Sequence, residues 1–244
     1  HTLFRLFLMR YTSNIIYGYN QICVTIESVH MYVLLKNIRM MNLETFQTLV
    51  RENLKGWYSR KEHEDKAVDR ITAIRAEFRA ILADVNRDGI AQVLDYLDEC
   101  GFFYRPSSVD RHHNYPGGLA EHCLGVYRKM LLYGLGDSFN ESVKIVGLFH
   151  DLCKCDMFYF NGREIFSHKR HGHGSRSVRI LRRFGVRLSG AEYRAIRYHM
   201  GKSNNPVRLK DPEFVKAIKE PLRKAVSWAD HEDSAEACAR ARRK

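Results

Sequence analysis

From residue 42 onward, hydrophobic residues recur at intervals of three and four, the spacing that places them on one face of an α-helix. The pattern predicts a short helix around residues 42–50 and helices over residues 61–83, 89–100, 118–133, 141–154, 173–184, 189–200 and 211–240. Ser189 and Glu192 have the spacing of a capping box, which indicates a helix start. Only residues 158–166, with Asn161-Gly162 at the centre, are typical of a β-hairpin. We therefore expect an all-α helical bundle with one small β-hairpin.

The first 40 residues differ from the rest of the chain, because they are rich in Thr, Ile, Tyr and Asn and contain one acidic residue, Glu27. We expect them to be an atypical N-terminal extension and the native domain to begin near Met41. Within that domain we expect N-terminal helices over residues 41–105 and a metal-binding core over residues 106–240. No run of about eighteen apolar residues predicts a transmembrane helix, and we expect no membrane partner. The six cysteines lack the spacing of a disulfide framework, which favours a cytoplasmic protein with reduced thiols.

The chain is basic, with 40 Lys and Arg residues against 28 Asp and Glu residues and a net charge of +12. Such a charge favours anionic partners, although a basic surface can also serve only solubility. The excess is concentrated in residues 163–187, where eight Lys or Arg residues accompany one acidic residue, Glu164. This distribution favours phosphate chemistry over a diffuse surface effect.

Several ionisable residues stand at apolar positions of the predicted helices. His122 follows Leu119 at a spacing of three, and Asp230 continues a repeat of four through Leu222 and Val226. Burying such groups without a partner costs several kcal/mol, roughly 2–7 for a neutral group, and helical bundles build metal sites from inward side chains of this kind. The complete set of candidate ligands is His122, His150, Asp151, His173, His199 and Asp230.

The chemistry of this set indicates which metals it suits. A mixture of imidazoles and carboxylates favours one or two divalent ions such as Mn, Fe, Co, Ni or Mg. Cys153 and Cys155, next to the His150-Asp151 pair, leave thiolate ligation open, but small buried side chains are the better interpretation.

These residues, in this order, resemble the HD superfamily of metal-dependent phosphohydrolases, whose signature is H…HD…D. The resembling segments are residues 113–122, residues 149–154, which contain His150-Asp151, and residues 228–230. Residues 173–177 and 198–201 resemble a subgroup common in phage and bacterial HD hydrolases. The resemblance implies that His122, His150, Asp151 and Asp230 hold a first metal ion. His173 and His199 would add a second ion or bind substrate phosphate.

The resemblance also implies a reaction, the hydrolysis of a phosphomonoester or phosphodiester by metal-activated water. The expected substrate is a phosphorylated small molecule, a nucleotide or a short oligonucleotide. Asp151 would accept a proton from the water, and Lys154, one turn after His150, would pair with a phosphate oxygen unless it is a solvated residue at a helix end. We expect one or two of Arg170, Arg176 and Arg179 to contact phosphate through bidentate hydrogen bonds.

Two other classes of function remain open. Some HD-type proteins are di-iron oxygenases, such as myo-inositol oxygenase, and use the same ligand order to activate oxygen. The chain could also be a nucleotide- or RNA-binding module with little activity. Single-stranded nucleic acid would suit the basic segment together with base stacking on Tyr104, Tyr115 or residues 158–160, although these aromatic residues could equally belong to the core.

Overall fold

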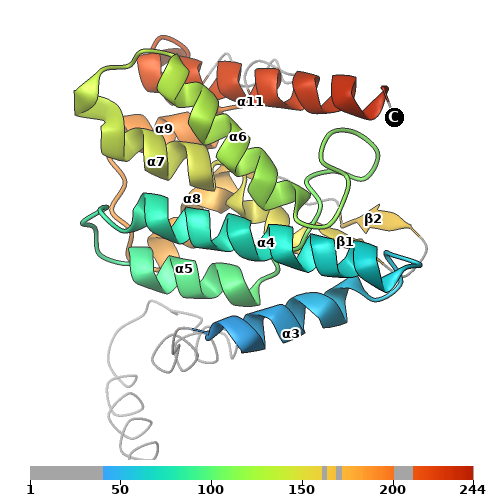
Figure 1. Ribbon diagram of the computed structural model, residues 1–244. Coiled ribbons are helices and arrows are strands. Elements are labelled where there is room, and N and C mark those ends of the chain that lie inside the picture. Colours follow the sequence, from blue (N-terminus) through green and yellow to red (C-terminus); the bar gives the residue numbers. More distant parts are fainter. Residues whose placement is uncertain (1–40, 161–163, 169–171, 201–210, 244) are drawn as a thin grey trace, which may run out of the picture. The chain divides into compact units, whose positions relative to one another are not determined.

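The computed structural model describes residues 41–160, 164–168, 172–200 and 211–243, which belong to one compact unit, Arg39–Lys244. In these residues the chain forms nine α-helices, two short 3-10 helices and one two-stranded antiparallel sheet (Figure 1). The predicted all-α fold with a small hairpin is confirmed for this part of the chain. Residues 1–40 lie outside the described residues, and the predicted boundary near residue 105 stays a prediction.

Three helices open the described chain: α3 (Leu43–Leu54), α4 (Lys61–Leu82) and α5 (Ile90–Glu99). The Asn42 side chain caps α3 by accepting a hydrogen bond from the Thr45 amide at 2.8 Å. Phe78 on α4 meets Phe102 and Phe103 edge to face, with ring centroids 5.4 and 5.5 Å apart. The edge-to-face arrangement is favourable for aromatic pairs, so these contacts stabilise the packing of α4 against the residues that follow α5.

The central helices are α6 (Gly118–Leu132) and α7 (Asn140–Phe149), the latter preceded by the 3-10 helix η1 (Asp137–Phe139). Helix α6 packs against both α7 and α11. The contact with α7 depends on Gly147, where an added Cβ atom would lie 2.8 Å from the Cα atom of Tyr127. Because any side chain at Gly147 would push the two backbones apart, this glycine allows residues at the facing positions of α6 and α7 to meet.

Helices α8 (His173–Arg183) and α9 (Gly190–Tyr198) form a second closely packed pair. An added Cβ atom at Gly174 would lie 2.4 Å from the carbonyl oxygen of Ile196, so the start of α8 rests on the end of α9. The capping box at the start of α9 is present as predicted: the Glu192 amide donates to Ser189 Oγ, and the Ser189 amide donates to the Glu192 carboxylate.

Two predicted helices are shorter than expected. Helix α7 ends at Phe149, and a 3-10 helix, η2 (Leu152–Asp156), follows, because the Cys153 amide donates to Ser177 Oγ at 3.0 Å rather than to a helical carbonyl. The helix expected over residues 211–240 is divided into α10 (Pro212–Ala217) and α11 (Pro221–Ala241). Pro221 lacks an amide hydrogen and clashes with a preceding helical turn, so it begins a helix instead of continuing one.

The hairpin consists of β1 (Phe158–Phe160) and β2 (Ile165–Ser167), with Tyr159 opposite Phe166. The predicted turn residues Asn161 and Gly162 lie outside the described residues. The Phe160 ring stacks on Trp57 at a centroid distance of 3.9 Å. The Arg105 guanidinium lies 4.1 Å from the centre of the Tyr159 ring. Aromatic contacts on both faces therefore hold this short hairpin in place.

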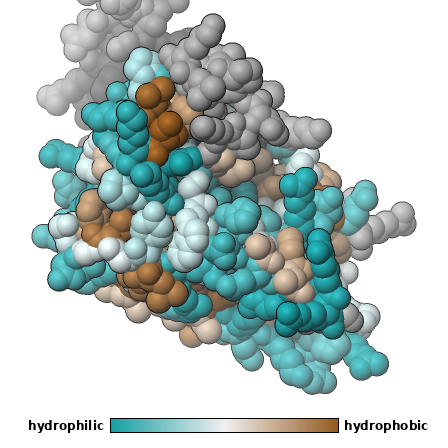
Figure 2. All heavy atoms as spheres, turned by 90° about the horizontal axis from the view of Figure 1, so that it is seen from above, coloured by the Kyte–Doolittle hydropathy of each residue, from teal (hydrophilic) through white to brown (hydrophobic). Residues whose placement is uncertain are grey.

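The surface seen from above, the side of α11 in Figure 1, is shown in Figure 2. Hydrophilic side chains predominate over the coloured part of this face, and hydrophobic ones form small separate groups. None of the helices in the described ranges has the length and apolar character that a membrane span requires.

Candidate metal centre

The structure brings together all six residues that the sequence predicts as metal ligands. They come from five places in the fold: the middle of α6, the end of α7, the first residue of α8, the C-cap of α9 and the middle of α11. The rings of His150 and His199 have centroids 5.0 Å apart, and those of His122 and His150 are 5.4 Å apart. Ligand atoms within 4.8 Å of one another form three overlapping groups from this set: His122, His150 and Asp151; His150, His199 and Asp230; and Asp151, His173 and His199.

The ring nitrogens of two of these histidines are oriented by backbone carbonyls. His150 Nδ1 donates to the Gly147 carbonyl at 2.9 Å, and His199 Nδ1 donates to the Ile196 carbonyl at 2.7 Å. When Nδ1 carries the proton of a neutral imidazole, Nε2 keeps its lone pair. The Nε2 atoms of His122, His150 and His199 are buried and have no hydrogen-bond partner among the described residues. One or two divalent cations would satisfy these atoms, so the residues present fit a metal centre.

Asp151 stands between the imidazoles and offers one oxygen to each side. Its Oδ2 atom lies 3.6 Å from Nε2 of both His122 and His150. Its Oδ1 atom lies 3.4 Å from Nε2 of His199 and also contacts Nε2 of His173. A carboxylate in this position can bind one ion or bridge two.

The pKa values in the cluster follow from burial and charge. Burial lowers the pKa of His150 to about 4, which keeps its ring neutral near pH 7. Burial alone would raise the pKa of Asp151, but the neighbouring Lys154 and His173 lower it well below its usual range. For His122, burial alone would lower the pKa, but the neighbouring carboxylates of Asp230 and Asp233 outweigh it and raise the pKa to about 9. The cluster therefore combines ionised carboxylates with at least one neutral imidazole.

Lys154 is part of the cluster and is not a solvated residue at a helix end. Its side chain is only 14% exposed, and Nζ lies 2.7 Å from Asp151 Oδ2. Nζ also lies 3.4 Å from the hydroxyl of Ser107. Burial alone would lower the pKa of Lys154, but the carboxylates of Asp151 and Asp230 raise it, so the amine is charged.

The three candidate arginines have different surroundings. Arg176 Nη2 lies 2.7 Å from Asp156 Oδ2, which commits this guanidinium to an internal ion pair. Arg179 is exposed on α8, and no acidic side chain of the described residues forms an ion pair with it. Arg170 lies outside the described residues.

The cysteines and aromatic residues singled out by the sequence are mostly packed. Cys153 and Cys155 are buried. Burial raises the pKa of the Cys153 thiol to about 12, and a thiol that holds its proton does not favour metal ligation. Cys153 Sγ lies 3.2 Å from Nδ1 of His173, the ring nitrogen that does not face Asp151. Tyr104 is buried in the core, and the Tyr115 hydroxyl lies 3.0 Å from His113 Nδ1. Residues 158–160 are half-buried in the hairpin.

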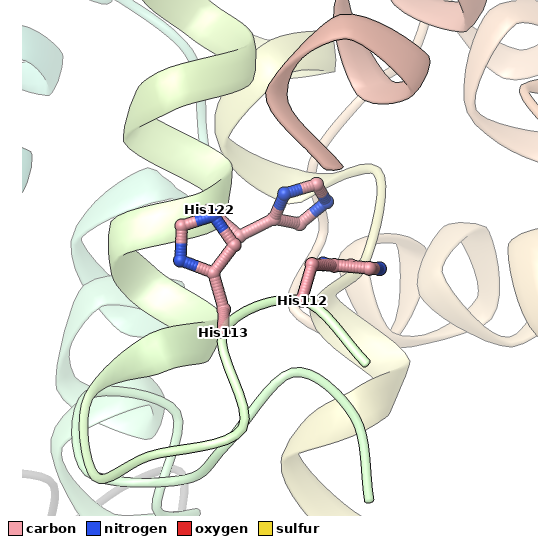
Figure 3. A group of neighbouring side chains, drawn as sticks. All are labelled: His112, His113 and His122. Atoms are coloured by element: carbon pink, nitrogen blue, oxygen red, sulfur yellow. The ribbon is translucent and has the colours of Figure 1, made fainter. Parts of the chain in front are cut away.

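Sequence reasoning missed three members of this region: His112, His113 and Asp233. His112, His113 and His122 have ring nitrogens within 4.8 Å of one another (Figure 3). Asp233 Oδ2 lies 2.8 Å from His122 Nδ1. The spacing of three between Asp230 and Asp233 places both on one face of α11 and was an available signal for Asp233. Residues 112 and 113 lie in a loop, where periodicity gives no signal.

Comparison with known proteins agrees with this geometry. A family model of the HD domain matches residues 119–235, which include all six candidate ligands and Asp233. No curated protein and no solved structure matched the chain. HD domains bind divalent metal ions, in agreement with the clusters of His and Asp found in the structure. Residues 119–235 therefore form an HD domain, the domain of a superfamily of metal-dependent hydrolases.

Proposed function

We propose that this protein is a metal-dependent phosphohydrolase that cleaves a phosphoester of a nucleotide or a short oligonucleotide. The observation that carries the proposal is a set of three buried Nε2 atoms around Asp151, from His122, His150 and His199, that make no hydrogen bond within the described part of the chain. Buried polar atoms of this kind are costly unless a ligand satisfies them.

The residues divide into two groups around Asp151. His122, His150, Asp151 and Asp230 would hold one ion, and Asp151 with His173 and His199 would hold a second. A bound divalent ion lowers the pKa of a coordinated water and neutralises charge on a phosphoryl oxygen. The mixed imidazole and carboxylate set suits Mn, Fe, Co, Ni or Mg.

Two side chains would act on the substrate and the water. Lys154 is the charged group nearest Asp151, and its ammonium would stabilise the negative charge that develops on the phosphoryl group. Asp151, which is ionised, would accept the proton of the attacking water through whichever oxygen faces it.

The charge on the exposed face of α8 supports an anionic substrate. Helix α8 begins with His173, and every exposed residue within it is an arginine: Arg179, Arg182 and Arg183. These side chains lie within about 15 Å of the first residue of the helix along its axis. An oligonucleotide whose scissile phosphate lies at the cluster would find further phosphate contacts there.

The test is metal analysis of the purified full chain followed by a substrate screen. Phosphomonoesters, cyclic dinucleotides and short RNA would be assayed for phosphate or nucleotide release with Mn²⁺, Co²⁺, Ni²⁺ or Mg²⁺. We expect one or two ions per chain, and loss of activity in His122→Ala and Asp151→Ala. Retention of both metal and activity in these variants would contradict the site. Bound iron with oxygen consumption and no ester hydrolysis would instead favour an oxygenase.

A further inference from the structure

We propose that Asp233, His113 and Tyr115 form a positioning unit that orients the metal ligand His122. The inference rests on the metal centre but not on the reaction proposed for it. Asp233 lies three residues after Asp230 on α11, and its side chain faces α6 rather than the other ligands. None of the three residues would touch the metal ion, so their role would be to fix the ring that does.

The group formed by His112, His113 and His122 is not a separate metal position (Figure 3). In Figure 3 the His122 ring comes from α6, and the other two rings come from the loop before it. Both ring nitrogens of His113 are already engaged, Nδ1 with the Tyr115 hydroxyl at 3.0 Å and Nε2 with Asp233 at 2.9 Å. His122 Nδ1 meets the same oxygen of Asp233 at 2.8 Å. The Asp233 carboxylate therefore joins two of the three histidines, His113 and His122.

The hydrogen bonds that link Tyr115, His113, Asp233 and His122 each have a defined donor and acceptor. A carboxylate can only accept, so His122 Nδ1 and His113 Nε2 both donate to Asp233. In its neutral form His113 then has an acceptor at Nδ1, to which the Tyr115 hydroxyl donates. A bound metal ion would displace the proton from Nε2 of His122, which lies 3.2 Å from Asp230 Oδ1, while Nδ1 would keep its proton on the Asp233 side. Partners of this kind fix the tautomer and ring orientation of metal-ligating histidines.

The backbone is shaped to hold the Asp233 carboxylate. An added Cβ atom at Gly125 of α6 would lie 2.0 Å from Asp233 Oδ1, so the carboxylate rests where a side chain would otherwise stand. His113 has a φ of 52°, the left-handed region that is uncommon for a residue other than glycine. Such strain persists only where surrounding contacts impose it. Here those contacts include the two hydrogen bonds that engage the His113 ring.

The experiment measures Mn²⁺ affinity of the metal-free full chain by calorimetry, without substrate. Asp233→Asn keeps the side-chain shape and removes the charge, and we expect affinity to fall about 10- to 100-fold. Tyr115→Phe removes only the last hydroxyl, so its affinity should fall less. The control is Glu236→Gln, which removes the negative charge from the 2.7 Å ion pair with Lys129 between the same two helices, α11 and α6, and should leave affinity unchanged.

Thermal unfolding of each metal-free variant separates positioning from stability. If Asp233 were only structural, Asp233→Asn would lower the melting temperature while the folded protein bound Mn²⁺ as the parent does, and the inference would be overturned. If Asp233→Asn does not fold, unchanged affinity in Tyr115→Phe overturns it equally. If the Asp233→Asn variant binds Mn²⁺ more weakly and the parent hydrolyses no phosphoester, the inference is supported and the proposed function is contradicted. A parent chain that binds no Mn²⁺ would overturn the inference, and activity with another ion would still leave the proposed function standing.

Discussion

The Nζ atom of Lys154 lies 2.7 Å from Oδ2 of Asp151, the carboxylate oxygen that also faces His122 and His150. A cation at this place repels a metal ion but attracts a substrate phosphate. We therefore expect Lys154→Met to lower kcat about 100-fold, the typical effect of removing one group that stabilises transition-state charge, and to leave metal content unchanged. Steady-state kinetics and elemental analysis of the same preparation test this.

A surface pair provides the control for Lys154. Lys144 Nζ lies 2.5 Å from Asp84 Oδ1, whose side chain is exposed. Lys144→Met removes a similar pair outside the site, so its kcat should equal that of the parent. Full activity in Lys154→Met would show that this lysine balances the charge of Asp151 and does not act on the substrate.

The close packing of α8 on α9 predicts that a single methyl group added at Gly174 lowers the stability of the protein. In Gly174→Ala the new Cβ atom would meet the carbonyl oxygens of Ile196 and Arg197 at 2.4 and 2.5 Å, and backbone atoms cannot move aside cheaply. We expect a loss of about 1–3 kcal/mol in the free energy of unfolding. Because the same contact brings His173 to His199, with ring centroids 5.2 Å apart, the number of ions bound per chain should also fall.

Gly190→Ala is the matched control for that change. Its Cβ atom would meet the flexible Arg194 side chain at 3.2 Å and no backbone atom within the same distance. Denaturant unfolding and metal analysis should give parental values for it. Equal values for Gly174→Ala and the parent would mean that the contact between α8 and α9 relaxes without cost.

A buried ion pair outside the ligand cluster predicts how stability depends on pH. The Glu192 carboxylate is fully buried and bonds to Arg87 at 2.7 and 2.8 Å. Burial alone would raise the pKa of Glu192, but Arg87, Ser142 and the Ser189 amide lower it. The unfolded chain therefore binds a proton more readily than the folded one. The stabilisation is present above the unfolded pKa of about 4.3 and is lost as the pH falls through the lower folded value.

Replacing this carboxylate should have two effects. Glu192→Gln should lower the free energy of unfolding near pH 7 by about 3 kcal/mol, since Arg87 loses its buried counter-charge. The fall in stability between about pH 5 and pH 3 should become shallower. Urea unfolding at several pH values tests both effects against Glu52→Gln, which changes an exposed residue of α3. An unchanged pH profile would contradict the assignment.

The sequence predicted the ligand-bearing helices well because local spacing controls which face of a helix is buried. His122 and Asp230 were recognisable as polar residues within apolar repeats. Asp233 shows the same spacing from Asp230, but its partner His113 lies 120 positions earlier in the chain, and no local pattern reveals a contact at that separation. The burial of Lys154 was also unpredictable, because it depends on η2 replacing the expected last turn of α7.

The exposed arginines of α8 predict how single-stranded RNA would bind. Neutralising phosphates releases counterions, so the logarithm of affinity falls with the logarithm of salt concentration, by about 0.7 per contact on a single strand. Arg179→Gln, Arg182→Gln and Arg183→Gln together should therefore reduce that slope by about 2. The control combines Lys216→Gln, Lys219→Gln and Lys224→Gln, which remove the same charge from exposed positions of α10, of α11 and of the turn between them. Fluorescence anisotropy with a short RNA between about 50 and 200 mM salt measures both slopes. Equal slopes in the two triple variants would mean that α8 is only a solvated basic face, and a smaller slope in the α8 variant alone would place the strand along the exposed face of α8.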